Sequence, residues 1–107
     1  MTKRSQLTRG HKRRVMFVEN KNGQIDGAAA RIGWVTFSKT GQSVHYRGRT
    51  LLKANGISGN FVDVENGDEY WVSGVKTRGS NVHWASSISF VVDDDAVTEY
   101  RKMKSAS

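Results

Sequence analysis

Cationic and aromatic side chains are interleaved in a predicted hairpin at residues 34–49, W-V-T-F-S-K-T-G-Q-S-V-H-Y-R-G-R. A sheet that binds nucleic acid needs cations for the phosphates and flat rings on which bases stack, at about 1–3 kcal/mol per base. One face and the tip of this hairpin offer both kinds of side chain, from Trp34, Lys39, His45, Arg47 and Arg49. The hairpin therefore predicts a nucleic-acid-binding surface. The alternative is an ordinary solvated β face on which one tryptophan is partly covered.

Two further segments carry the charge that phosphate binding requires. Residues 1–14 hold six Lys or Arg and no acid. A tail that includes Arg13 and Arg14 could therefore neutralise several phosphates, with an affinity that falls steeply with salt. A solubilising extension is the alternative for this tail. In K-T-R-G-S-N-V-H-W, residues 76–84, Lys76 and Arg78 could hold a phosphate or form part of a plain polar hairpin loop.

The residue types give little support to catalysis. His45 and His83 are the only histidines of the predicted fold, and a small phosphodiesterase would need the two rings side by side. Turn chemistry explains the acids at 63–69, and helix capping explains D-D-D at 93–95. Cysteine, a nucleophile elbow and a His-Glu-x-x-His motif are all absent from the sequence. We therefore expect no enzyme activity, no catalytic residue, no cofactor and no metal site.

The elements that position these residues are predicted to be short strands. Eleven glycines, no proline and apolar residues with period two favour strands joined by glycine turns. The expected strands lie near 14–19, 31–38, 43–51, 59–65, 69–75 and 82–92. Since closure removes the exposed edges of a small sheet, the predicted fold is all-β, a five- to six-stranded barrel of the Src-homology-3-like or oligonucleotide-binding-like kind.

The two ends of the chain differ from this pattern. Residues 1–13 have almost nothing apolar to bury and are predicted to form a disordered basic tail. The segment D-D-D-A-V-T-E-Y-R-K-M-K has acids first, cations last and apolar residues at helical spacing, which predicts one short helix at 94–104. A single domain over 14–104 is therefore expected.

Hairpin register decides which aromatic side chains are left outside the barrel. At 34–49, an even loop centred on Thr40-Gly41 places Phe37 opposite Val44, on an apolar face. In F-V-D-V-E-N-G-D-E-Y-W-V-S-G, residues 61–74, a three-residue loop at 65–67 pairs Val62 with Tyr70 on an apolar face. This register sends two aromatic side chains to the acid-bearing outer face, as candidates for contact with a protein partner: Phe61 and Trp71.

Charge and hydropathy also bear on the environment of the protein. The net charge is +7, but beyond residue 14 the chain has eleven Lys or Arg against ten Asp or Glu, so the positive charge is mostly in the tail. The first twenty residues contain no apolar run typical of a signal peptide, and no run is long enough to span a bilayer. We expect a cytoplasmic protein with no membrane contact.

Four segments of the sequence form a distinctive set: V-E-N-K-N-G at 18–23, A-A-R-I-G-W-V-T-F-S-K-T-G at 29–41, Y-R-G-R-T at 46–50 and Y-W-V-S-G-V-K at 70–76. Together they resemble a group of short uncharacterised bacterial proteins. Such proteins sometimes carry an automatic name as a deoxyxylulose-phosphate synthase. A thiamine-diphosphate enzyme of that kind needs a much longer chain and a Gly-Asp-Gly cofactor motif, and the sequence has neither. The resemblance, over about residues 15–100, implies a compact bacterial cytoplasmic domain and no catalytic residues.

The leading hypothesis is a non-enzymatic binding module that contacts nucleic acid through its basic tail and the hairpin face. The alternative is a protein-interaction or self-associating module that uses a sheet edge or the pair Phe61 and Trp71. A small phosphodiesterase that uses His45 and His83 is the third hypothesis.

Overall fold

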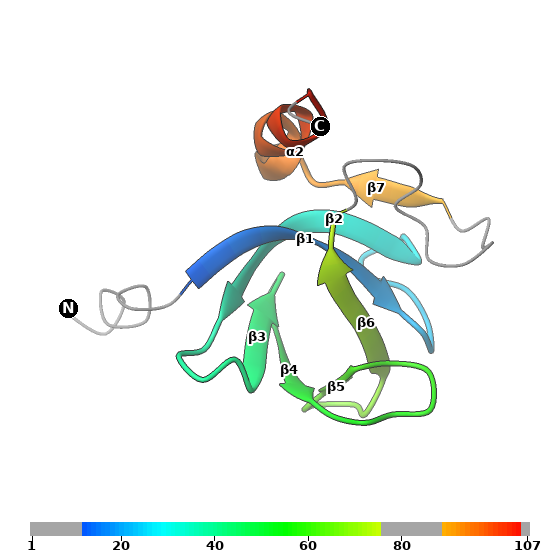
Figure 1. Ribbon diagram of the computed structural model, residues 1–107. Helices are drawn as coiled ribbons and strands as arrows, with labels where there is room; N and C mark the ends of the chain where they lie inside the picture. The colour runs from blue at the N-terminus through cyan, green and yellow to red at the C-terminus, as the bar shows by residue number, and fades with distance from the viewer. Residues whose placement is uncertain (1–11, 76–88, 106–107) are drawn as a thin grey trace.

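A computed structural model describes residues 12–75 and 89–105 of the chain. Six antiparallel strands form a closed barrel: β1 (Lys12–Asn20), β2 (Ala30–Phe37), β3 (Ser43–Tyr46), β4 (Arg49–Lys53), β5 (Phe61–Asp63) and β6 (Glu69–Gly74). Each strand pairs with its neighbours in sequence, and β1 pairs with both β2 and β6, which closes the sheet (Figure 1). The predicted small all-β barrel is confirmed.

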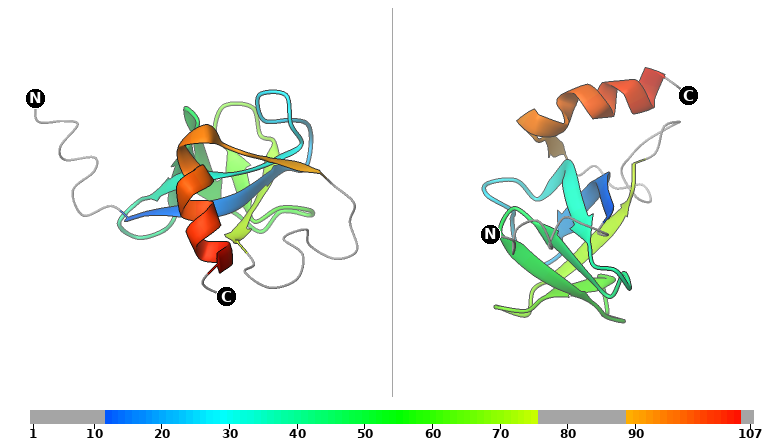
Figure 2. Two further views of the ribbon diagram at one scale, coloured as in Figure 1. Left: turned by 90° about the horizontal axis from the view of Figure 1, so that it is seen from above. Right: turned by 90° about the vertical axis from the view of Figure 1, so that its left-hand side faces the viewer.

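A short C-terminal unit lies on the outside of this barrel. Strand β7 (Phe90–Val92) runs parallel to β2, and the 3₁₀ turn η1 (Asp94–Ala96) and helix α2 (Val97–Ser105) follow it. Figure 2 shows α2 lying outside the barrel, over β1 and β2. The predicted C-terminal helix is confirmed. Its three apolar residues at helical spacing all pack against the barrel: Ala96, Tyr100 and Met103.

Alternation along β1 divides the apolar residues into two clusters. Met16 and Val18 point into the barrel, where they pack with inward residues of the other strands. Val15 and Phe17 point outward, where the C-terminal unit covers them. Strand β1 is therefore buried on both faces from Val15 onward, whereas its first three residues are exposed.

The β2–β3 hairpin has the register expected from the sequence. Phe37 pairs with Val44, and Val35, Val44 and Tyr46 are buried in the barrel. The strand expected at 43–51 is instead two strands, because Arg47 and Gly48 both have positive φ and form a tight turn between Tyr46 and Arg49. Positive φ at both central positions is what a two-residue type I′ hairpin turn requires.

The register predicted for the β5–β6 hairpin is wrong. Phe61 pairs with Tyr70, so both rings face the barrel interior, and residues 64–68 connect the two strands. The inward position that this register gives to Asp63 is compatible with burial, because its carboxylate accepts the N–H of Glu65 at 2.8 Å and so shapes the turn.

Some predicted features lie at or beyond the limits of the described residues. Strand β1 begins at Lys12, so Lys12 and Arg13 belong to a strand and not to the expected tail. Lys76, Arg78, His83 and most of the strand expected at 82–92 lie outside the described residues. In the part of the chain that the structure describes, no helix is long and apolar enough to cross a membrane.

Candidate nucleic-acid interface

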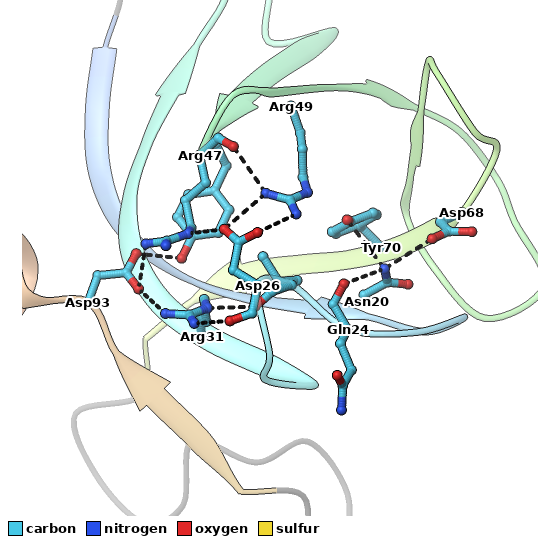
Figure 3. A network of polar contacts seen from close by, with 11 residues as sticks. Asn20, Gln24, Asp26, Arg31, Arg47, Arg49, Asp68, Tyr70 and Asp93 are labelled. Atoms are coloured by element: carbon cyan, nitrogen blue, oxygen red, sulfur yellow. Dashed lines mark hydrogen bonds and ion pairs between the residues drawn. The ribbon is translucent and has the colours of Figure 1, made fainter.

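Two of the arginines predicted to bind phosphate are ion-paired within the protein. Arg47 Nε donates to Asp26 Oδ2 at 2.7 Å, and Arg49 Nη2 donates to Asp26 Oδ1 at 3.0 Å (Figure 3). The hydrogen bonds from Arg49 and Arg47 hold the pKa of Asp26 well below its usual range. Asp26 can take this position because Asp26 and Gly27 both have positive φ, in a tight turn that Ile25 and Ala28 close.

A second carboxylate fastens the C-terminal unit to the barrel. Asp93 is only 6% exposed, and it accepts hydrogen bonds from Tyr46 Oη at 2.5 Å and from Arg31 Nη1 at 2.9 Å. Arg47 Nη1 lies 3.4 Å from the same carboxylate. Burial, with the bond to Asp93, raises the pKa of Tyr46. Asp93 stands at the predicted cap position, but its side chain makes no cap hydrogen bond and binds these barrel residues instead.

Trp34 and His45 also make contacts within the protein. The indole Nε1–H of Trp34 donates to the carbonyl of Asp95 at 2.9 Å, and the guanidinium carbon of Arg13 lies 4.5 Å from the Trp34 ring centroid. Trp34 packs against the outer apolar cluster, so covered packing, and not an open stacking face, describes it. His45 Nδ1 lies 3.1 Å from Thr50 Oγ1.

Cations without such partners converge at one end of the barrel. A pocket of about 240 Å³ is lined by Lys12, Arg14, Phe37, Ser38, Lys39, Thr40 and Gly41. Lys12 is the Cα partner of Phe37, and Arg14 is the partner of Val35, so both cations continue the inward face of β1 beyond Met16. Pairing of β6 with β1 begins only at Met16, and Figure 1 shows the start of β1 beside the β2–β3 turn.

The charge of this pocket is not compensated by acids. None of the residues that line it is acidic, and no ion pair within residues 12–75 and 89–105 involves Lys12, Arg14 or Lys39. The segments outside those ranges contain no Asp or Glu in the sequence, so they have no acidic side chain to supply. The pocket therefore holds three positive charges that are free to meet an external anion.

Two hydroxyl groups at the pocket are oriented by the turn that carries them. Ser38 Oγ accepts the N–H of Ser43 at 3.1 Å, and Thr40 Oγ1 accepts the N–H of Gln42 at 3.3 Å. A hydroxyl that accepts a hydrogen bond still has its own proton to donate. Ser38 and Thr40 can therefore add neutral donors to the cations around a bound phosphate.

Neither aromatic residue proposed for protein contact is freely exposed. Phe61 is 7% exposed and belongs to the barrel interior, because of the register of the β5–β6 hairpin. Trp71 points outward but packs against the outer cluster. Among the described residues, the large apolar side chains that are exposed, and not only partly buried, are Leu52, Ile57, Val64 and Val91.

The other candidate sites offer less support for ligand binding or catalysis. A second pocket, of about 310 Å³, lies around Arg31, Arg47 and residues 91–95, where the cations already contact Asp93. Within the described ranges, no group of three or more His, Cys, Asp or Glu could hold a metal ion. Because His83 lies outside those ranges, the structure gives no distance between the two histidines of the phosphodiesterase hypothesis.

The sequence identified part of the cationic pocket. From the sequence, Lys39 and Arg14 are predicted to contact phosphate. Lys12 belongs to the predicted tail, and Phe37 is expected only on the apolar face of the hairpin. The register of β1 against β2 brings Lys12 and Phe37 to the pocket, and no local sequence pattern predicts that register. Comparisons with family models, curated proteins and solved structures found no match, so the chemistry of this pocket carries the functional argument.

Proposed function

We propose that the protein is a non-enzymatic module that binds the phosphate backbone of nucleic acid at the pocket around Lys12, Arg14 and Lys39. The observation that supports this proposal is the convergence of three cations without acidic partners on one concave site. Phosphate oxygens are the anions most often met by Lys, Arg and hydroxyl donors at nucleic-acid interfaces.

The basic segment before β1 favours a polymeric anion over a small one. Lys3, Arg4 and Arg9 precede Lys12 in the sequence without any intervening acid. Several cations in series match a chain of phosphates, each of which releases a counterion when it is neutralised. The site and this segment together would bind successive phosphates of one strand.

A protein-binding role is the second candidate, and one loop supports it. Ile57 is 97% exposed in the loop between β4 and β5. The loop is held in place because Ser58 and Gly59 donate backbone N–H groups to the carboxylate of Glu69, at 2.7 and 2.8 Å. A fixed loop that presents an isoleucine to solvent suits contact with an apolar pocket of another protein.

A pair of double variants tests the nucleic-acid proposal. Binding of labelled single- and double-stranded DNA and RNA is measured over a series of salt concentrations. The variant Arg14→Ala/Lys39→Ala removes two pocket cations, whereas the control Arg101→Ala/Lys102→Ala removes two exposed cations from α2. Loss of two phosphate contacts should weaken binding about tenfold or more near 0.1 M salt and lower the slope of log K against log salt by about 1.4–1.8.

The control defines the outcomes. Equal loss in both variants would mean that net charge alone drives binding, and it would contradict a role for the pocket. Absence of binding by the unaltered protein at low salt would overturn the proposal and favour the protein-binding candidate.

A further inference from the structure

The cationic pocket also contains an aromatic ring. Phe37 lines the pocket and is only partly buried. On β1 its Cα partner is the cation Lys12, and on β3 its partner is the buried Val44. The ring is therefore braced by the barrel interior on one side and lies beside a cation on the other.

The other aromatic residues of the described barrel are less available to a ligand. Phe17, Tyr46, Phe61 and Tyr70 are at most 7% exposed, and Trp34 and Trp71 pack against the outer cluster. The predicted stacking platform at Trp34 is covered by Arg13. Phe37 is thus the ring that the structure places together with unpaired cations.

We infer that this pocket takes one unstacked nucleotide of a single strand, with its base against Phe37 and its phosphate on Lys12, Arg14 and Lys39. This inference rests on the proposed function and names its substrate class. The volume, about 240 Å³, lies below the roughly 300–1,000 Å³ of pockets for drug-sized ligands. A site of this size has no room for a stretch of several bases.

A duplex cannot use the ring in this way. In a double helix the base faces are stacked on one another, and only splayed bases of single strands reach aromatic side chains. Phosphates of a duplex can still meet the exposed cations at the rim of the pocket. The ring therefore adds affinity for single strands alone, on top of a charge term that both kinds of nucleic acid share.

Three probes separate the ring from the charges. The full chain is titrated with a labelled oligothymidylate, with a duplex of equal length, and with a single strand of the same length in which the sugars carry no bases. We expect the oligothymidylate to bind about fivefold to 160-fold more tightly than the strand without bases, the range that one stacked base supplies. The affinity of the duplex should be close to that of the strand without bases, when the two are compared at salt concentrations that compensate for the higher charge density of the duplex.

Two variants at one position complete the test. Phe37→Leu keeps an apolar side chain against Val44 but removes the flat ring, so the preference for oligothymidylate should fall toward one while the salt slope is retained. Phe37→Tyr keeps the ring and should keep the preference. Thermal unfolding checks that both variants fold. If Phe37→Leu does not fold, the inference is tested by comparing the affinities of the unaltered protein for strands with and without bases.

The outcomes distinguish this inference from the proposed function. Equal binding of strands with and without bases would overturn the single-nucleotide inference and leave phosphate binding intact. A base preference that survives Phe37→Leu would also overturn it. If none of the three probes binds at low salt, the proposed function itself fails.

Discussion

Whether each Lys or Arg forms an ion pair within the protein depends on whether an acid lies within reach of its side chain. Residues 27–62 contain five Lys or Arg and no acid. Arg47 and Arg49 nevertheless find Asp26, which is 21 and 23 residues away along the chain. Lys39 forms no ion pair among the described residues, and it lines a pocket with two further cations, Lys12 and Arg14.

Replacement of Asp26 by Asn tests this ion-pair cluster through its pH dependence. The folded protein holds the pKa of Asp26 below its unfolded value of about 3.9, so the charge stabilises the fold above that pH and the effect is lost as the pH falls. Asn tolerates positive φ, so the change acts on the charge and not on the turn. Urea unfolding should show Asp26→Asn less stable at pH 7, with a difference that shrinks between pH 4 and pH 2.

An exposed acid outside this cluster gives the matched control. Glu65→Gln makes the same change in charge, and no ion pair among the described residues uses Glu65. Its stability should differ little from that of the unaltered protein over the same pH range. A constant difference for Asp26→Asn from pH 7 to pH 2 would show that the charge of Asp26 is not what stabilises the cluster.

At the scale of elements, alternation predicted a hairpin correctly where the apolar residues alone define its faces. The β2–β3 register follows from Val35, Phe37 and Val44, and the structure has it. In β5–β6 the same argument failed, because buried Asp63 serves the turn through its bond to the Glu65 N–H. A polar residue with a local backbone partner does not report which face is buried.

The contact between β2 and the C-terminal unit depends on a glycine. A Cβ added to Gly33 would clash with the Asp93 carboxylate and would lie 2.9 Å from a ring carbon of Tyr46. Asp93 has little freedom to move away, because Arg31 and Tyr46 both bind it. Gly33→Ala should therefore lower the free energy of unfolding by about 1–3 kcal/mol, as measured by urea denaturation.

A second glycine provides the comparison for Gly33→Ala. Gly74 ends β6, and a Cβ built there meets nothing within 4 Å. Gly74→Ala should leave stability within about 0.5 kcal/mol of the unaltered protein. Similar stabilities for the two variants would mean that the carboxylate of Asp93 is not confined as the structure describes.

In the molecule as a whole, the cations that pair with acids and the cations of the pocket lie at different places. Only part of this distribution could be predicted from the sequence. Composition located the basic N-terminal segment, and alternation predicted the barrel, because both depend on neighbouring residues. The pocket depends on long-range pairing, since β1 and the β2–β3 turn meet through the partners Lys12 and Phe37. Pairing across such a distance decides which cations share a site, and no local window contains it.

Deletion of residues 1–11 tests how the basic segment and the pocket divide the binding of a strand. The deletion removes Lys3, Arg4 and Arg9 but leaves β1 and the pocket complete. If each of these cations neutralises one phosphate of a single strand, the slope of log K against log salt should fall by about 2. The preference for strands with bases should persist, because Phe37 is retained.

The full-length variant Lys3→Gln/Arg4→Gln/Arg9→Gln is the control, because it removes the three charges without shortening the chain. Its salt slope should match that of the deletion if the charges of the segment, and not its length, account for the effect. Loss of the base preference on deletion would show instead that the segment, and not the pocket, contacts the bases.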